Sequence, residues 1–139
     1  MDRIPRHATV PTVLIIEDSP VVQHLLRVTL AVLEVELLFA DCGETALELV
    51  RTHRPDLITL DIGLPGIDGW QVLAEVRADP ETSDIGVIVL TAHAQKSMQQ
   101  AAEDSGTDGF FAKPFQPAEL RKAVESLLDR IAIGAVVNL

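Results

Sequence analysis

Residues 13–20 read Val-Leu-Ile-Ile-Glu-Asp-Ser-Pro, and this stretch decides the fold of the chain. Its first four residues are all apolar and mostly β-branched, which is typical of a short strand buried on both faces of a parallel sheet. The apolar run stops at Glu17 and Asp18, so two carboxylates follow directly on the end of the strand. Asp18 or Ser19 can cap a helix, and Pro20 suits its first turn. The stretch therefore predicts a buried strand, an acidic turn and a helix.

The same unit recurs along the rest of the sequence. Short apolar runs predict four more strands, and apolar residues at helical spacing predict a helix after each of them; the strands are expected at 35–40, 56–61, 87–90 and 109–112. Alternating strands and helices imply a parallel sheet with helices on both faces. Right-handed crossovers leave few topologies. The leading candidate is an α/β, flavodoxin-like, doubly wound sheet of five parallel strands in the order 2-1-3-4-5, with five helices. Glu36 predicts that the second strand lies at the sheet edge.

Length and composition indicate one compact domain. The chain has 139 residues, 47% of them hydrophobic and only 4% aromatic, so we expect an aliphatic core. We expect a flexible tail at 1–11, the folded domain at 12–131 and an apolar extension or linker stub at 132–139. The formal charge of −10 argues against direct binding to nucleic acid or to an anionic membrane. Cys42 is the only cysteine, which excludes an internal disulfide and favours a cytoplasmic location.

Polar side chains follow four of the five predicted strands at their carboxyl ends. In open α/β sheets functional groups gather beyond these ends, so the sequence brings together five residues: Glu17, Asp18, Asp61, Thr91 and Lys113. Three carboxylates in one place repel one another unless a cation balances them. Mg²⁺ takes oxygen ligands and favours a few carboxylates together with a phosphate. A carboxylate can also act as a nucleophile and become an aspartyl phosphate. The set therefore suits magnesium-dependent phosphoryl transfer.

These motifs, with Leu-Pro-Gly-Ile-Asp-Gly at 64–69 and Lys-Pro-Phe at 113–115, resemble the receiver domain of two-component response regulators over roughly residues 12–131. The resemblance implies that Asp61 is the phosphoacceptor. It implies that Mg²⁺ is bound by Asp18 directly, by Glu17 through water, by Asp61 and by the backbone carbonyl of Gly63.

Further roles follow from the same resemblance. Thr91 matches the switch hydroxyl, Lys113 the phosphate-binding lysine and Phe110 the switch aromatic. The peptide bond before Pro114 is expected to be cis. The implied donor is a histidine kinase or a histidine phosphotransfer protein, and the implied output is a protein target that contacts the fourth helix, fifth strand and fifth helix. Such a domain is no enzyme for other substrates, since it catalyses only its own phosphorylation and dephosphorylation.

Other functions fit the sequence less well. A flavin-binding protein of this topology needs a phosphate-binding turn after the first strand, and the acidic turn here would repel a phosphate without a metal. A phosphohydrolase with an aspartate nucleophile typically has a second Asp two residues on, where this chain has Gly63. The remaining alternative is a degenerate receiver that acts only as a protein-binding module. His93, near the acidic rim, fits equally well a residue that affects the lifetime of the phosphoryl group and a surface histidine without a role. His24, on the first helix, lies near the expected docking position of a phosphodonor domain, but a solvent-exposed residue without function is the better interpretation.

Overall fold

Five strands alternate with five helices along the chain. The computed structural model describes residues 10–92 and 95–137, with side chains up to residue 132. The strands are β1 (Thr12–Ile16), β2 (Glu36–Ala40), β3 (Leu57–Asp61), β4 (Gly86–Thr91) and β5 (Gly109–Ala112). The helices are α1 (Pro20–Leu30), α2 (Gly43–His53), α3 (Gly69–Ala78), α4 (Lys96–Asp104) and α5 (Pro117–Val137).

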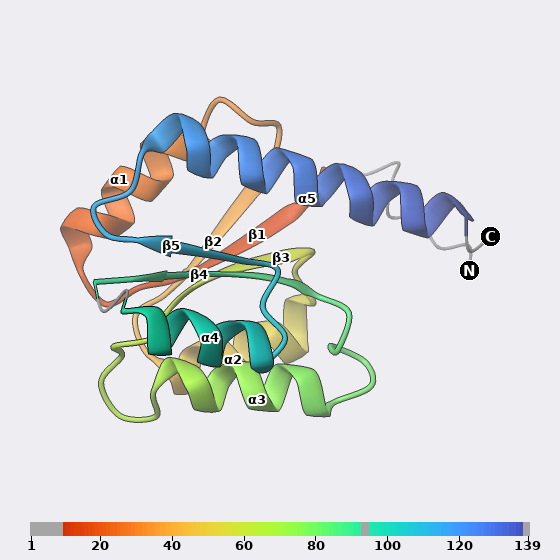
Figure 1. Ribbon diagram of the computed structural model, residues 1–139. Coiled ribbons are helices and arrows are strands. Elements are labelled where there is room, and N and C mark those ends of the chain that lie inside the picture. Colours follow the sequence, from red (N-terminus) through yellow and green to blue (C-terminus); the bar gives the residue numbers. More distant parts are fainter. Residues whose placement is uncertain (1–9, 93–94, 138–139) are drawn as a thin grey trace.

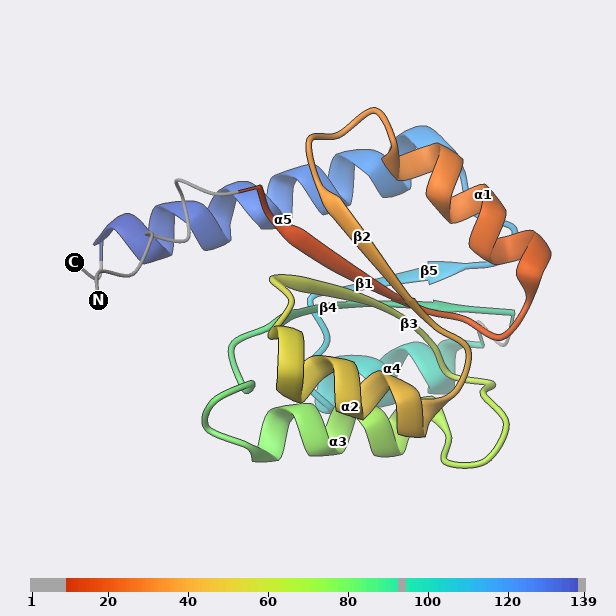
Figure 2. The ribbon, with the colours of Figure 1, turned by 180° about the vertical axis from the view of Figure 1, so that it is seen from behind.

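The strands form one parallel sheet in the order β2-β1-β3-β4-β5, which confirms the predicted topology. β2 is an edge strand, as Glu36 indicated. Helices α1 and α5 cover one face of the sheet, and α2, α3 and α4 cover the other (Figures 1 and 2). All strands therefore point their carboxyl ends toward one edge of the molecule, where the acidic turn after β1 lies.

The core consists of two aliphatic clusters separated by the sheet. Strands β3 and β4 are buried at every position, because helices cover both of their faces. On the α2–α3 side, Leu14, Ile58 and Val89 pack with Val72 from α3. On the α1–α5 side the cluster contains Val13, Ile15, Leu26, Ile88, Leu120 and Val124. The alternation of strand side chains between the two clusters fixes the register of the sheet.

Helix α5 continues beyond the end expected for the domain. It runs as far as Val137, and its last turns extend past the sheet (Figures 1 and 2). The division into a domain at 12–131 and an extension at 132–139 stays a prediction, and residues 1–9 of the predicted tail lie outside the described residues. Within the described part of the chain, none of the helices combines the length and hydropathy needed to cross a bilayer.

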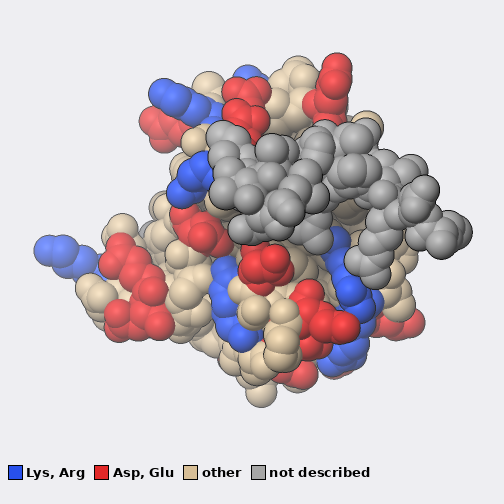
Figure 3. Space-filling model, turned by 90° about the vertical axis from the view of Figure 1, so that its right-hand side faces the viewer, with Lys and Arg blue, Asp and Glu red and all other residues tan. Residues whose placement is uncertain are grey.

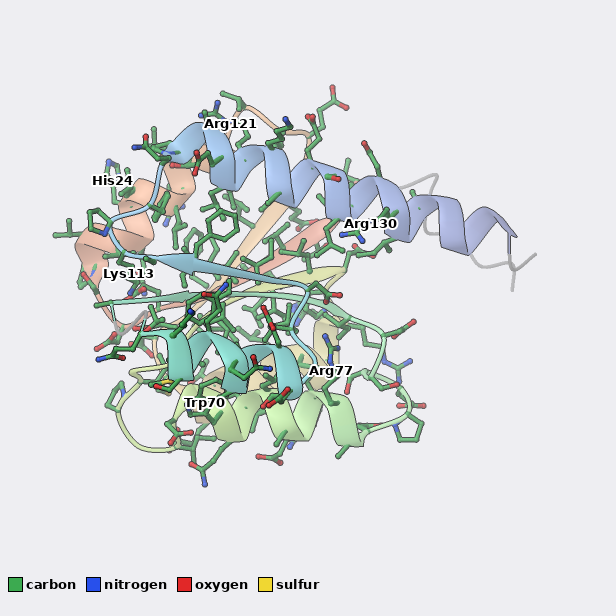
Figure 4. All side chains as sticks on the ribbon, viewed as in Figure 1. His24, Trp70, Arg77, Lys113, Arg121 and Arg130 are labelled. Atoms are coloured by element: carbon green, nitrogen blue, oxygen red, sulfur yellow. The ribbon has the colours of Figure 1, made fainter. Side chains whose placement is uncertain are left out.

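Arg77, near the end of α3, connects three segments at the amino ends of the strands. Its guanidinium donates to the carbonyl oxygen of Gly106 at 2.8 and 3.0 Å and to that of Ile85 at 2.6 Å. It also contacts Oδ2 of Asp108 at 3.2 Å. Figure 4 shows Arg77 near the opposite end of the sheet from Lys113. Where this end is described, acidic and basic side chains are interspersed on its surface (Figure 3).

Candidate functional site

Three carboxylates meet at the carboxyl edge of the sheet, as the sequence predicted. Glu17, Asp18 and Asp61 each offer an oxygen within 4.8 Å of the others. Glu17 and Asp61 are buried, at 2% and 7% exposure, whereas Asp18 is exposed. Ser19 caps α1 by accepting a hydrogen bond from the amide of Val22, so the turn that carries Glu17 and Asp18 is closed directly onto the helix.

Lys113 supplies the positive charge of the site. Its Nζ lies 2.5 Å from Oε1 of Glu17 and 3.4 Å from Oδ2 of Asp61. The backbone amide of Lys113 donates to the carbonyl oxygen of Thr91 at 2.9 Å, which ties the end of β5 to the end of β4. The peptide bond between Lys113 and Pro114 is cis, as predicted. The ammonium group therefore lies between the two buried carboxylates.

Burial raises the pKa of the Glu17 carboxyl above its ordinary value of 4.5, and the hydrogen bond from Lys113 partly offsets this effect. The neighbouring charge of Asp61 adds to the increase. One ammonium group among three carboxylates leaves the cluster with an excess of negative charge. A cation at this position would relieve that excess.

The backbone around Asp61 is closely packed. The amide of Gly63 donates to Oδ1 of Asp61 at 3.1 Å, which fixes the direction of the carboxylate. The amide of Gly69, the first residue of α3, donates to the carbonyl oxygen of Ile62 at 3.1 Å. A Cβ atom at Gly69 would lie only 2.5 Å from the backbone oxygen of Asp61, so only glycine allows α3 to begin this close to the carboxylate.

The donor set fits a hard divalent cation. Three carboxylates from two strand ends provide oxygen ligands on one side, and the exposed position of Asp18 leaves room for water on the other. Mg²⁺ prefers this combination of a few carboxylates with retained water. Glu17, Asp18 and Asp61 are therefore the residues that would hold it.

The other candidates occupy different environments. Thr91 is fully buried at the end of β4. Phe110 is half-buried and packs against the cluster on the α2–α3 side of the sheet. His24 is exposed on α1, at the same end of the molecule as Lys113 (Figure 4). His93 lies outside the described residues.

The sequence did not reveal the roles of two residues that shape the site, although Gly69 belongs to the motif at 64–69. Gln23 donates from its side-chain amide to the carbonyl oxygen of Glu17 at 2.6 Å. Gly69 allows the close approach of α3 to Asp61 described above. Neither residue type signals such a role. Only the positions of these residues relative to the helix starts could have indicated their roles. Gln23 lies one turn after the N-cap Ser19, and Gly69 directly follows the N-cap Asp68.

Comparison with known proteins agrees with this geometry. Residues 13–125 match the family described as response regulator receiver domain. The DNA-binding dual master transcriptional regulator RpaA of Synechocystis sp. is 37% identical over 120 residues, which are 86% of this chain and 50% of RpaA. The chain thus spans about half the length of the curated relatives that it matches.

Solved structures show the same fold. The chemotaxis protein CheY4 of Vibrio cholerae superposes with a TM-score of 0.79 at 25% identity, over 86% of this chain and 99% of that one. The receiver domain of the sensor histidine kinase PA1611 of Pseudomonas aeruginosa, solved with a magnesium ion in its active-site cleft, gives a TM-score of 0.79 at 28% identity, over 87% and 99%. From the family match, the strand order and the acidic edge it follows that this chain belongs to the receiver domains of two-component response regulators.

Proposed function

We propose that Asp61 is the phosphoacceptor of this receiver domain. The observation that carries the proposal is the grouping of Asp61 with two further carboxylates and the ammonium group of Lys113 at one edge of the sheet. A carboxylate oxygen of Asp61 attacks the phosphorus atom of the donor. The new O–P bond forms as the bond from phosphorus to the donor nitrogen breaks, and the product is an aspartyl phosphate.

The residues around Asp61 prepare it for this step. The amide of Gly63 holds Oδ1, so the carboxylate keeps one orientation as the donor approaches. Lys113, 3.4 Å from Oδ2, is placed to bind an oxygen of the incoming phosphoryl group. When bound by Glu17, Asp18, Asp61 and the carbonyl of Gly63, Mg²⁺ supplies positive charge that offsets the charge of the phosphoryl oxygens.

The phosphoryl group would favour a second conformation of the domain through contacts made only in that state. Thr91, at the end of β4, is the hydroxyl that would bind it, and Phe110 on the neighbouring strand β5 would move together with Thr91. Helix α4 is suited to such a change, because Ala102 is its only buried residue. The output surface is then α4, β5 and α5, where a protein target would bind the phosphorylated form more tightly.

The donor is proposed to be a histidine kinase or a histidine phosphotransfer protein. A groove lined by Val22, Leu25, Lys113, Pro114 and Phe115 lies directly beside the site. On α1, which forms one wall of the groove, exposed apolar side chains follow one another at helical spacing: Val21, Leu25 and Val28. A helical donor that covers this face would bring its phosphohistidine to Asp61. Such a surface fits a protein donor.

The test is the intact mass of the protein after incubation with acetyl phosphate and Mg²⁺, compared with Asp61→Asn. We expect one added phosphoryl group in the wild type and none in the variant or without Mg²⁺. Asp104→Asn, on the exposed face of α4, is the matched control and should still be labelled. A folded wild-type protein that stays unlabelled by both acetyl phosphate and phosphohistidine donors would support a degenerate receiver that only binds proteins. Label that persists in Asp61→Asn would overturn the assignment of the acceptor.

A further inference from the structure

Glu17 is held by a partner at each of its polar groups. Its backbone amide donates a hydrogen bond to the carbonyl oxygen of Ala40 at 3.0 Å, and its backbone carbonyl oxygen accepts one from the side-chain amide of Gln23 at 2.6 Å. Its carboxylate accepts from the amide of Ser19 at 3.1 Å and from Lys113. The position of Glu17 is therefore set from β2, from α1 and from the end of β5 together.

Asp18, in contrast, depends on its backbone. Among the described residues its carboxylate makes no hydrogen bond or ion pair, and the side chain is exposed. The peptide group that joins Glu17 to Asp18 contains the carbonyl oxygen that Gln23 binds. The orientation of this peptide plane sets the direction of the Cα–Cβ bond of Asp18. A hydrogen bond from Gln23 that holds the plane therefore affects the orientation of Asp18 as well as that of Glu17.

Gln23 is well anchored for this purpose. It lies on α1, one turn after the N-cap, and its backbone amide donates to the carbonyl oxygen of Ser19 at 2.9 Å. Its side chain then reaches back across the start of the helix to Glu17. The amide group is neutral, so it binds the carbonyl without changing the charge of the acidic cluster. A lysine or arginine in this role would add a positive charge that competes with a metal ion.

We propose that Gln23 is a positioning residue for Mg²⁺: its side-chain amide fixes the Glu17–Asp18 peptide so that the carboxylate of Asp18 stays turned toward Asp61. The proposal rests on the proposed function, since it concerns the metal that this function requires. Outer-shell partners of metal ligands commonly contribute about 10- to 100-fold to metal affinity. We expect Gln23 to contribute near the lower end of that range, because Mg²⁺ retains water at such sites.

The experiment measures Mg²⁺ binding to the unphosphorylated protein by NMR titration of backbone amides, without any phosphoryl donor. Gln23→Met keeps the length and charge of the side chain but removes the donor, and should weaken Mg²⁺ binding by about 10-fold. Gln99→Met makes the same exchange on exposed α4 and should bind Mg²⁺ like the wild type. Unfolding by urea without Mg²⁺ checks that each variant is folded.

Gln23→Glu separates positioning from charge. It adds a negative charge near the cation, which by itself would tighten Mg²⁺ binding. It also directs a carboxylate at the carbonyl of Glu17, which would release the peptide. If both Gln23→Met and Gln23→Glu bind Mg²⁺ more weakly than the wild type, the proposal is supported. Unchanged binding in Gln23→Met, with unchanged or tighter binding in Gln23→Glu, overturns it while leaving the phosphoacceptor role intact. A wild-type protein that binds no Mg²⁺ overturns this proposal and the metal part of the proposed function together.

Discussion

Replacing Gly69 by alanine tests how closely the phosphoacceptor depends on the start of α3. The added Cβ would lie 2.5 Å from the backbone oxygen of Asp61 and 2.7 Å from Cα of Ile62, where an ordinary contact is at least 3.4 Å. Both neighbours are backbone atoms, so no side-chain rotation can make room. The two segments would have to separate by roughly 0.9 Å, which would break the hydrogen bond from Gly69 to Ile62.

Two effects should follow from this separation. Overpacking of a closely packed site lowers the free energy of unfolding by about 1–3 kcal/mol. A displacement of about 1 Å at the reacting carboxylate costs on the order of 100-fold in rate. We therefore expect Gly69→Ala to fold and to take up phosphoryl groups from acetyl phosphate roughly 10- to 100-fold more slowly than the wild type.

The assay is the initial rate of labelling by intact mass at saturating Mg²⁺, with stability measured by urea denaturation. Gly109→Ala is the matched control, because it adds the same methyl group at the amino end of β5, away from Lys113. There the new Cβ meets the side chain of Ile88 at 3.4 and 3.7 Å and that of Phe111 at 3.7 Å, which are ordinary contacts. Gly109→Ala should therefore be labelled within about threefold of the wild-type rate. Equal rates in Gly69→Ala and the wild type would refute the argument that backbone packing positions Asp61.

Three further predictions concern single residues. Among the described residues, the hydroxyl of Thr59 is the one buried side-chain oxygen without a hydrogen-bond partner. Thr59→Val should therefore increase the free energy of unfolding by about 1 kcal/mol, seen as a higher urea midpoint at unchanged m-value. A lower midpoint would show that the hydroxyl has a partner. Because burial raises the pKa of Glu17, the folded metal-free protein binds this proton more tightly than the unfolded chain does. The stabilisation that the protonated Glu17 provides is therefore complete at a pH below the ordinary pKa of 4.5, and it is lost as the pH rises through the raised pKa. Glu17→Gln should flatten this part of the plot of unfolding free energy against pH, and an equally steep plot would contradict the assignment. Thr91→Ala should be labelled at Asp61 within about threefold of the wild-type rate, but with smaller phosphorylation-induced NMR shift changes in α4 and β5; undiminished changes would exclude Thr91 as the switch.

The sequence predicted the fold because its strong signals are local. Continuous apolar runs marked the buried strands, and each ended in a polar residue whose place on the sheet follows from the parallel topology alone. This is why Glu17, Asp61 and Lys113 were brought together correctly although Lys113 is far from the others along the chain. Glu36 likewise marked the edge strand, because a charge in a strand buried on both faces would be costly.

The parts that escaped prediction depend on distances. The contact between Gln23 and the carbonyl of Glu17 leaves no pattern, because a glutamine on an amphipathic helix is ordinarily a solvated residue. The need for glycine at 69 comes from the backbone of Asp61, which approaches it only in the folded chain. The continuation of α5 to Val137 was also not apparent, since the apolar residues after 131 lack the polar side that marks an amphipathic helix.

The contacts of Arg77 have a consequence for how α4 can move. They hold the carbonyl of Gly106, just beyond the carboxyl end of α4, whereas Gln95 at the amino end provides no side-chain cap. Among the described contacts, the carboxyl end of α4 is therefore the more firmly held, and we expect a tilt of the helix to pivot about that end. Over the helix length of about 13 Å, a tilt of roughly 10° would move the amino end by about 2 Å. The amino end lies a few residues after Thr91 in the sequence, so we expect a partner to detect phosphorylation most sensitively by contacting the first turn of α4.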